Sequence, residues 1–454
     1  MEIAILIIFI IGYLAITLEH QLKVDKLVPA LIMMALSWAI LALGIDSFTN
    51  WFDSHTMTII EGFGLKGHEE KMHILESSLL HHFGKTSEIL IFLIGAMTIV
   101  EIIDHFDGFS TIKKFIRTNS KKTLLWIIAI LAFILSAIID NLTATIVLIS
   151  ILTKLIKERE DRIWYVGMII ITANAGGAWS PIGDVTTTML WMGDKVTTLK
   201  LIEHLILPSL ICMLLPTLIA SRMKAFQGTF EAPEETEKPH KRADMMLYIG
   251  LGLIIAVPIF KTITHLPPYV GMMLSLAIFT IFAEIISNRE FEMAQATSSG
   301  SHHSPVHSAL TKIEMPSLLF FLGILMTVAA LESLGMIFFF GQTVEGSIGT
   351  DFFVIILGFA SAIVDNVPLV AASMGMFPDL LIDHPDWHLI AFTAGTGGSM
   401  LIIGSAAGVV AMGMERIDFF WYLKRMGFLA FIGYAAGVAS FYFFNEYLFK
   451  ALGI

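Results

Sequence analysis

The stretch SAIIDN, residues 136–141, places an aspartate and an asparagine in the middle of a long apolar run. Acidic side chains inside a membrane segment are costly and most often mark a functional site. The chain repeats this stretch almost letter for letter as SAIVDN at residues 361–366. The sequence therefore buries the same acid–amide pair twice, as Asp140–Asn141 and Asp365–Asn366.

The composition is that of an all-α polytopic membrane protein. The 454 residues are 56% hydrophobic and 15% charged, with a mean hydropathy of +0.78, whereas soluble proteins carry roughly 25% charged residues. No basic domain is present that would bind nucleic acid, and the single Cys212 excludes an internal disulfide. No nucleophile–base set, phosphate loop or metal-ligand cluster appears, so we expect neither an enzyme nor a cofactor.

Apolar runs divide the chain into twelve candidate membrane segments. The predicted single crossings are residues 3–18, 27–44, 88–103, 201–221, 245–260, 269–286, 317–335 and 426–447. Two further segments, 163–193 and 387–413, are rich in Gly, Ser and Thr and are predicted to be broken helices. The last two, 124–156 and 352–382, carry the DN pairs at their centres.

The DN segments are expected to form re-entrant helical hairpins. Their 33 and 31 residues exceed the length of about 20 that one crossing needs. If both turn around at the DN pair, 21 of the 28 Lys and Arg residues lie on one side of the membrane; as single crossings they leave the charges almost evenly divided. Since basic residues accumulate in the cytoplasm, both termini are predicted to lie outside.

The chain is predicted to contain two inverted repeats, residues 1–222 and 244–454, joined by a cytoplasmic linker at 223–243. TANAGGAWSPIGD (172–184) aligns without a gap to TAGTGGSMLIIGS (393–405), with six of 13 positions identical. Each half contains five crossings, an odd number, so the second half enters from the opposite face. Such repeats are typical of secondary transporters.

Histidines outside the predicted membrane segments are expected to be surface residues. His302, His303 and His307 lie in a low-complexity polar stretch, and His81 and His82 lie in a predicted outward loop at 45–87. A pH-sensing role for the loop histidines is the alternative.

The candidate site residues all offer oxygen ligands near the middle of the membrane. Gly-Gly and Ser-Pro pairs unwind a helix and expose carbonyl groups and two half-helix ends, which suit a small ion. No Arg or Lys lies among the candidates, and hard cations such as Na⁺ and Li⁺ prefer oxygen. The candidates are Asp140, Asn141, Thr143, Thr172, Asn174, Ser180 and Asp184 in the first half, and Asp365, Asn366, Thr393, Thr396, Ser399 and Ser405 in the second.

Three of these candidates, Asp140, Asp184 and Asp365, are acids that can exchange a proton for a cation. A low-dielectric surrounding disfavours the charged form of a carboxyl group, so a buried aspartate holds either a proton or a metal ion. Competition for one acid then couples the movement of the cation to that of the proton.

The chain resembles the NhaD-type sodium/proton antiporters of the ion transporter (ArsB/NhaD) superfamily. The resemblance rests on SAIIDNLTAT, TANAGGAWSPIGDVTT, SAIVDNVPLV and the TAGTGG stretch, and covers nearly the whole chain. It implies a homodimer in the bacterial inner membrane, with a transport domain that moves like an elevator against a scaffold domain. It also implies a Na⁺ site at Asp140, Asn141 and Asn174, with Asp184 close by, and a second site at Asp365, Asn366 and Thr393.

The second half departs from the first at two positions, with Gly395 in place of Asn174 and Ser405 in place of Asp184. The two sites are therefore expected to differ, with the principal cation site in the first half. The function predicted is electrogenic exchange of cytoplasmic Na⁺ or Li⁺ for external H⁺. The alternatives are an arsenite or anion permease of the same superfamily and a non-transporting membrane scaffold or sensor.

Overall fold

A computed structural model describes residues 1–53, 56, 58–114, 116, 118–230, 241–295 and 304–445. Residues 231–240 of the predicted linker, together with His302 and His303, lie outside the described residues.

The described chain is almost entirely helical. The helices up to residue 220 are α1 (Glu2–Thr17), α2 (Glu19–Leu22), α3 (Leu27–Leu43), α4 (His68–His105), α5 (Ser110–Lys113), α6 (Lys121–Ile139), α7 (Asn141–Leu155), α8 (Arg159–Gly177), α9 (Val185–Met192) and α10 (Thr198–Ala220). Those that follow are α11 (Ala243–Thr264), α12 (Pro268–Gln295), α13 (Pro305–Leu310), α14 (Met315–Ser333), α15 (Met336–Ser347), α16 (Thr350–Ser361), α17 (Asn366–Met376), α18 (Pro385–Gly397), α19 (Ala406–Glu415), α20 (Phe419–Tyr422) and α21 (Phe428–Phe443). A π-helical turn, Leu423–Gly427, joins α20 to α21. The strands β1 (Phe52–Asp53) and β2 (Thr58–Ile59) pair antiparallel, with Phe52 opposite Ile59.

The helices confirm a membrane protein. Among the described residues, seven helices are long and apolar enough to cross a bilayer, or eight if α15 and α16 count as one bent span. A helix occupies each of the eight predicted single crossings, although α1 and α3, with 16 and 17 residues, belong to a shorter class of apolar helix.

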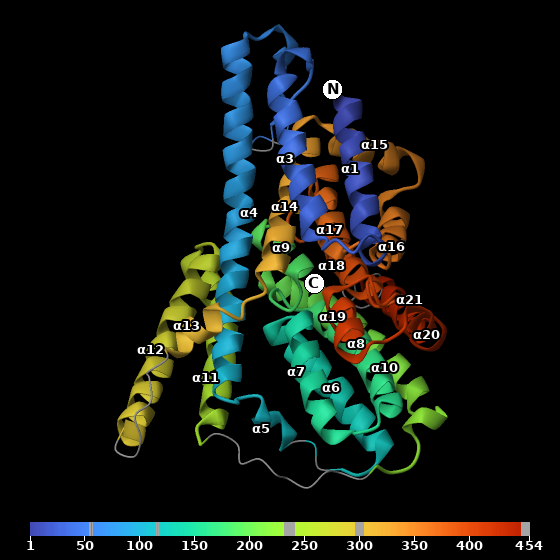
Figure 1. Ribbon diagram of the computed structural model, residues 1–454. Coiled ribbons are helices and arrows are strands. Elements are labelled where there is room, and N and C mark those ends of the chain that lie inside the picture. Colours follow the sequence, from blue (N-terminus) through green and yellow to red (C-terminus); the bar gives the residue numbers. More distant parts are fainter. Residues whose placement is uncertain are drawn as a thin grey trace. The chain divides into compact units, whose positions relative to one another are not determined.

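The predicted loop at 45–87 was wrong over its second half. Helix α4 begins at His68, has 38 residues and is about 57 Å long. It is the long blue helix of Figure 1. Its first turns carry many polar residues and so lack the apolar run by which membrane helices are recognised. His81 and His82 consequently lie half-buried on this helix and are not surface loop residues.

The chain divides into two compact units. The first comprises residues 1–91, 314–354 and 367–381. In this unit α3 packs against α1 and α14, and the Trp38 indole donates a hydrogen bond of 2.8 Å to the carbonyl of Met326. An added Cβ at Gly323 would lie 2.7 Å from the Ala30 carbonyl carbon, so the missing side chain lets α14 approach α3 at backbone distance.

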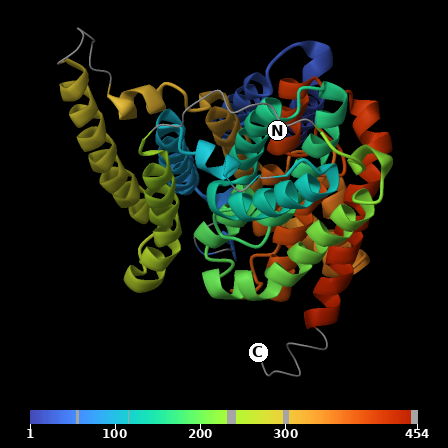
Figure 2. The ribbon, with the colours of Figure 1, turned by 90° about the horizontal axis from the view of Figure 1, so that it is seen from below.

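The second unit comprises residues 92–313, 355–366 and 382–454 and contains every candidate site residue. Its core packs α6 against α7 and α8, and α10 against α21. Helices α11 and α12 form a pair, visible in Figures 1 and 2 as adjacent yellow-green rods. Helix α19 contacts both α7 and α8, and α18 contacts α8 and α9, so segments of the two sequence halves interleave.

The two DN pairs lie at helix boundaries with different backbones. Helices α6 and α7 are joined by Asp140 alone, which has φ 74° and ψ 160°. That region is nearly reserved for glycine and costs a residue with a side chain roughly 1–3 kcal/mol. By contrast, α16 ends at Ser361 and residues 362–365 form a turn before α17 begins at Asn366.

Each Gly-rich segment contains two helices separated by a break. Seven residues separate α8 from α9, and eight separate α18 from α19. Each first part is held close to a DN-bearing helix: an added Cβ at Gly176 would lie 2.2 Å from the Phe133 carbonyl oxygen, and one at Gly397 would lie 2.1 Å from that of Gly358. A side chain at either position would separate the backbones, so glycine is required in both halves.

Candidate cation site

The central residue of the site is Asp184, which caps the N-terminus of α9. Helix α8 ends at Gly177, and Ser180–Pro181 lie in the break that follows, where proline lacks an amide donor. Asp184 then restarts the helix by accepting a hydrogen bond of 3.2 Å from the amide of Thr186, the usual role of aspartate at this position. Its side chain is buried, with 2% exposed.

Two asparagines, one from each DN pair, bind this carboxylate. Asn141 donates to Asp184 Oδ2 at 3.3 Å, and Asn366 donates to Oδ2 at 3.2 Å and to Oδ1 at 3.4 Å. Both amides are buried. One carboxylate therefore takes hydrogen bonds from donors 43 residues before it and 182 residues after it.

Asn174 extends the cluster to the second broken helix. Its Oδ1 accepts from Asn141 at 2.8 Å, and its Nδ2 donates to Ser405 Oγ at 3.0 Å. Ser405 is the N-cap of α19 and accepts from the Gly408 amide at 3.2 Å. Asn174 is fully buried, so its amide is satisfied only by partners inside the protein.

The acids Asp140 and Asp365 directly precede the two asparagines of the cluster. Asp140 caps α7 and accepts from the amide and the hydroxyl of Thr143, both at 2.8 Å. Asp140 and Asp365 are half-buried. The helix N-termini at Asp140, Asp184 and Ser405 carry the positive ends of their dipoles, which partly offset the three acids.

Five of the predicted hydroxyl ligands bond within their own segment. Thr172 donates to Met168 O at 2.8 Å and Thr393 to Leu389 O at 2.9 Å, at equivalent places in the two broken helices. Thr396, Ser399 and Ser180 also bond locally. Such bonds are common for serine and threonine in helices. Because these hydroxyls already bond within their own segments, they are weaker candidates for cation ligands than Asp184 or Asn174.

The two expected sites meet in one cluster. Asn141 of the first set bonds to both Asn174 and Asp184, whereas Asn366 of the second set bonds to Asp184 of the first. Thr393 makes its hydrogen bonds to its own helix. The arrangement brings oxygen-bearing groups of both halves around a single carboxylate.

Two residues beside Asp184 were not among the predicted site residues: Thr186, and Gly395, which the sequence showed only as a departure from the first half. An added Cβ at Gly395 would lie 3.2 Å from Asp184 Oδ2 and 3.8 Å from Thr186 Oγ1. Thr186 is fully buried, and its hydroxyl has no hydrogen-bond partner of normal geometry among the described residues. The signal available was the position of Thr186 two residues after a helix-capping aspartate, which brings its side chain near the break.

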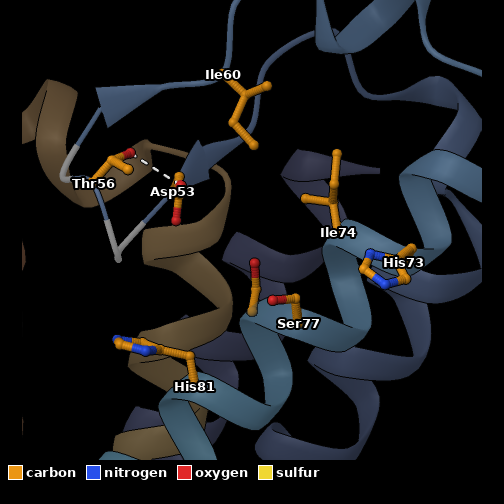
Figure 3. A pocket seen from close by; sticks show the side chains of 8 residues that line it. Asp53, Thr56, Ile60, His73, Ile74, Ser77 and His81 are labelled. Atoms are coloured by element: carbon orange, nitrogen blue, oxygen red, sulfur yellow. Dashed lines mark hydrogen bonds between the residues drawn. The ribbon is translucent and has the colours of Figure 1, made fainter.

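A separate cavity of about 310 Å³ lies in the first unit. Figure 3 shows the side chains that line it, among them Asp53, Thr56, His73, Ser77 and His81. Within the described ranges, no group of three or more His, Cys, Asp and Glu side chains is arranged to hold a metal ion.

Broken apolar helices that enclose a buried carboxylate and its amide partners define a membrane transporter. The chain belongs to the CitMHS citrate transporter family, whose model matches residues 4–395, and groups with the NhaD-type sodium/proton antiporters. It is 40% identical over 447 residues to sodium/proton antiporter 1 of Arabidopsis thaliana, covering 97% of this chain and 72% of that protein. Sodium/proton antiporter 2 of the same plant is 37% identical over 444 residues, covering 96% and 98%.

More distant comparisons agree on the class. The Na⁺/H⁺ antiporter NhaD of Alkalimonas amylolytica is 29% identical over 97% of this chain and 90% of its own length. The solved structure of the Alcanivorax borkumensis YdaH transporter has a TM-score of 0.57 at 12% identity, covering 92% of this chain and 98% of that one. At that identity the likeness concerns the fold alone. These relatives are transporters and not enzymes.

Proposed function

We propose that this protein exchanges Na⁺ for H⁺ across a membrane, and that Asp184 is the acid for which the two ions compete. The observation that carries the proposal is the shared carboxylate: a buried Asp184 receives amide donors from both DN pairs. The names of the antiporter relatives support the same exchange.

The charge of the cluster favours a cation over an anion. The acids are Asp184, which accepts hydrogen bonds from both asparagines, and Asp140 and Asp365, which directly precede those asparagines. No Lys or Arg lies among the cluster residues. Carboxylate, amide and hydroxyl oxygens are the ligands that Na⁺ and Li⁺ prefer over transition metals. No cofactor is needed for exchange at such a site.

The exchange follows because Asp184 alternates between a state that holds a proton and a state that holds Na⁺. When Asp184 is protonated it is neutral and suits its buried setting; when it is ionised, the amides of Asn141 and Asn366 and a cation stabilise the charge. A proton therefore leaves as Na⁺ arrives. In this proposal more than one H⁺ is exchanged for each Na⁺, so the exchange is electrogenic.

The proposed architecture is two inverted repeats, 1–222 and 244–454, with re-entrant hairpins at 124–156 and 352–382. Matched hydrogen bonds support the repeat: Ser136 Oγ donates to Ala173 O, and Ser361 Oγ donates to Ala394 O, both at 2.6 Å. In this proposal the protein is a homodimer in the bacterial inner membrane, its termini lie outside, and an elevator movement carries cytoplasmic Na⁺ or Li⁺ outward against incoming H⁺.

Everted membrane vesicles with a pH-sensitive dye test the exchange. We expect Na⁺ and Li⁺, but not K⁺, to dissipate a respiration-driven proton gradient in vesicles that contain the protein, relative to vesicles without it. The same assay over a range of pH and with the membrane potential clamped measures electrogenicity. An unchanged dye signal on adding Na⁺ at every pH would exclude the proposal.

A further inference from the structure

Three helices present their N-terminal ends to the cation cluster, and basic side chains bind the C-terminal ends of all three. These helices are α7, which begins at Asn141, α9, capped by Asp184, and α19, capped by Ser405. With 15, 8 and 10 residues, they place their C-terminal ends about 12–22 Å from the cluster. The basic residues there do not touch the cation site.

Lys261 of α11 binds the end of α9. Its ammonium group donates to the carbonyl of Trp191 at 2.7 Å and to Asp194 Oδ1 at 2.9 Å, and lies 4.9 Å from the centre of the Trp191 ring. A charge at the negative end of a helix dipole is favourable, and a helix of two turns is marginal without such partners. Lys261 therefore fixes the end of the segment that Asp184 begins.

Arg162 and Arg159 of α8 bind the ends of α7 and α19. Arg162 donates to Ile156 O at 2.8 Å, just after α7, and forms a two-pronged ion pair with Glu415 at 2.5 and 2.9 Å. Arg159 donates to Glu415 O at 2.9 Å and to Arg416 O at 2.7 Å. Glu415 is 3% exposed, so this ion pair is buried and its geometry is rigid.

We propose that Arg162 and Lys261 are positioning residues of the cation site, which act by fixing the axial positions of α7, α9 and α19 and so of Asn141, Asp184 and Ser405. A helix held only at its N-terminus can slide or tilt along its axis. Binding at the opposite end removes this freedom and keeps the oxygens at coordinating distance. This inference rests on the proposed function, because it concerns the affinity of the same site.

The experiment compares Lys261→Met with Lys261→Arg, and Arg162→Met/Glu415→Met with wild type. Removing both members of the buried pair leaves no unpaired charge inside the protein. Half-saturation by Na⁺ and maximal exchange rate are measured in vesicles, and Na⁺-dependent thermal stabilisation is measured on the purified protein. We expect the Met variants to raise the Na⁺ concentration that gives half-maximal exchange about 5- to 20-fold, with a smaller change in maximal rate. Lys261→Arg should keep this concentration near the wild-type value.

Lys121→Met is the matched control, because Lys121 binds Asp161 in the same unit at 2.5 Å without binding a helix C-terminus. A positioning role is overturned if Lys261→Met and the double variant keep the wild-type half-saturation, or if Lys121→Met shifts it equally. If the Arg162→Met/Glu415→Met variant fails to reach the membrane, the comparison of Lys261→Met with Lys261→Arg tests the proposal by itself. Absence of Na⁺ exchange by wild type would instead overturn the proposed function, and Na⁺-dependent stabilisation would still report on positioning.

Discussion

The two broken helices, α8–α9 and α18–α19, follow one backbone plan but differ where they meet. Each has a Gly-Gly pair at the break and a capping side chain at the restart. Yet the first contributes Asn174 and Asp184, and the second contributes Gly395 and Ser405. The residues that differ between the halves contact one another: Asn174 donates to Ser405, and Gly395 lies against Asp184.

This pairing explains why the two halves cannot be identical at the centre. An asparagine at position 395 would occupy the space beside Asp184 Oδ2, where even a Cβ would lie at 3.2 Å. A second aspartate at 405 would add a further negative charge to a cluster that already has three acids. The smaller, uncharged residues of the second half, Gly395 and Ser405, therefore leave the space and the charge balance that Asn174 and Asp184 of the first half require.

The largest expected effect is that of Asp184→Asn. The variant keeps the shape of the side chain but removes the exchangeable proton and the charge that binds a cation, so Na⁺-dependent dequenching in vesicles should fall to background. Glu158→Gln, an exposed position at the start of α8, is the control and should behave like wild type. Measurable exchange by Asp184→Asn would move the central role to Asp140 or Asp365.

Replacing Asp140 or Asp365 with Asn tests whether the two outer acids are equivalent. We expect each variant to fold and to lose exchange, because each removes a half-buried acid that directly precedes an asparagine bound to Asp184. Expression and gel filtration monitor folding, and vesicle assays monitor exchange. Full activity of one variant would remove that acid from the mechanism and would make the difference between the halves still greater.

Gly395→Ala and Gly395→Asn test the requirement for empty space beside Asp184. The added Cβ should weaken Na⁺ binding by roughly 1–3 kcal/mol, the usual cost of overpacking, and the asparagine should abolish exchange. Li⁺ is smaller, so its half-saturation should rise less than that of Na⁺ in Gly395→Ala. An equal rise for the two ions would indicate that Gly395 serves helix packing only.

Ser405→Ala should have a moderate effect. The change removes an N-cap, which is worth about 1 kcal/mol, and leaves Asn174 Nδ2 without its acceptor. We expect half-saturation by Na⁺ to rise about fivefold while the maximal rate changes little. Ser405→Thr, which keeps the hydroxyl, is the matched variant and should remain near wild type; if both variants behave alike, the bond from Asn174 is unimportant.

The smallest effects are expected at the equivalent hydroxyls of Thr172 and Thr393. Both donate to carbonyls of their own helices, so Thr172→Ala and Thr393→Ala should change half-saturation by less than about twofold. Parallel Na⁺ titrations of the two variants compare the halves directly. A large effect of Thr172→Ala alone would indicate a separate cation site in the first half.

Much of the helical fold is predictable because membrane helices leave long apolar runs. The breaks near Gly177 and Gly398 are also predictable, since paired glycines and Ser-Pro act locally. The early start of α4 was missed because its first turns are polar, and hydropathy carries no signal for them.

The sequence predicts candidate residues for the site but not the hydrogen bonds that connect them. Asp140, Asp184 and Asp365 stand out because each is an acid in an apolar run. The bond from Asn366 to Asp184 joins residues 182 apart, and that from Asn174 to Ser405 joins residues 231 apart. Local patterns predict that each half folds on itself and do not predict which amide of one half meets which acid of the other.

The packing around Cys212 has a practical consequence. It is the only cysteine in the sequence, it is buried, and its sulfur would lie 3.4 Å from a Cβ added at Gly433 of the neighbouring α21. Membrane-impermeant maleimides therefore have no native thiol to modify, and a cysteine introduced at an exposed position becomes the single labelled site. The sidedness of each loop can thus be mapped in the otherwise wild-type protein.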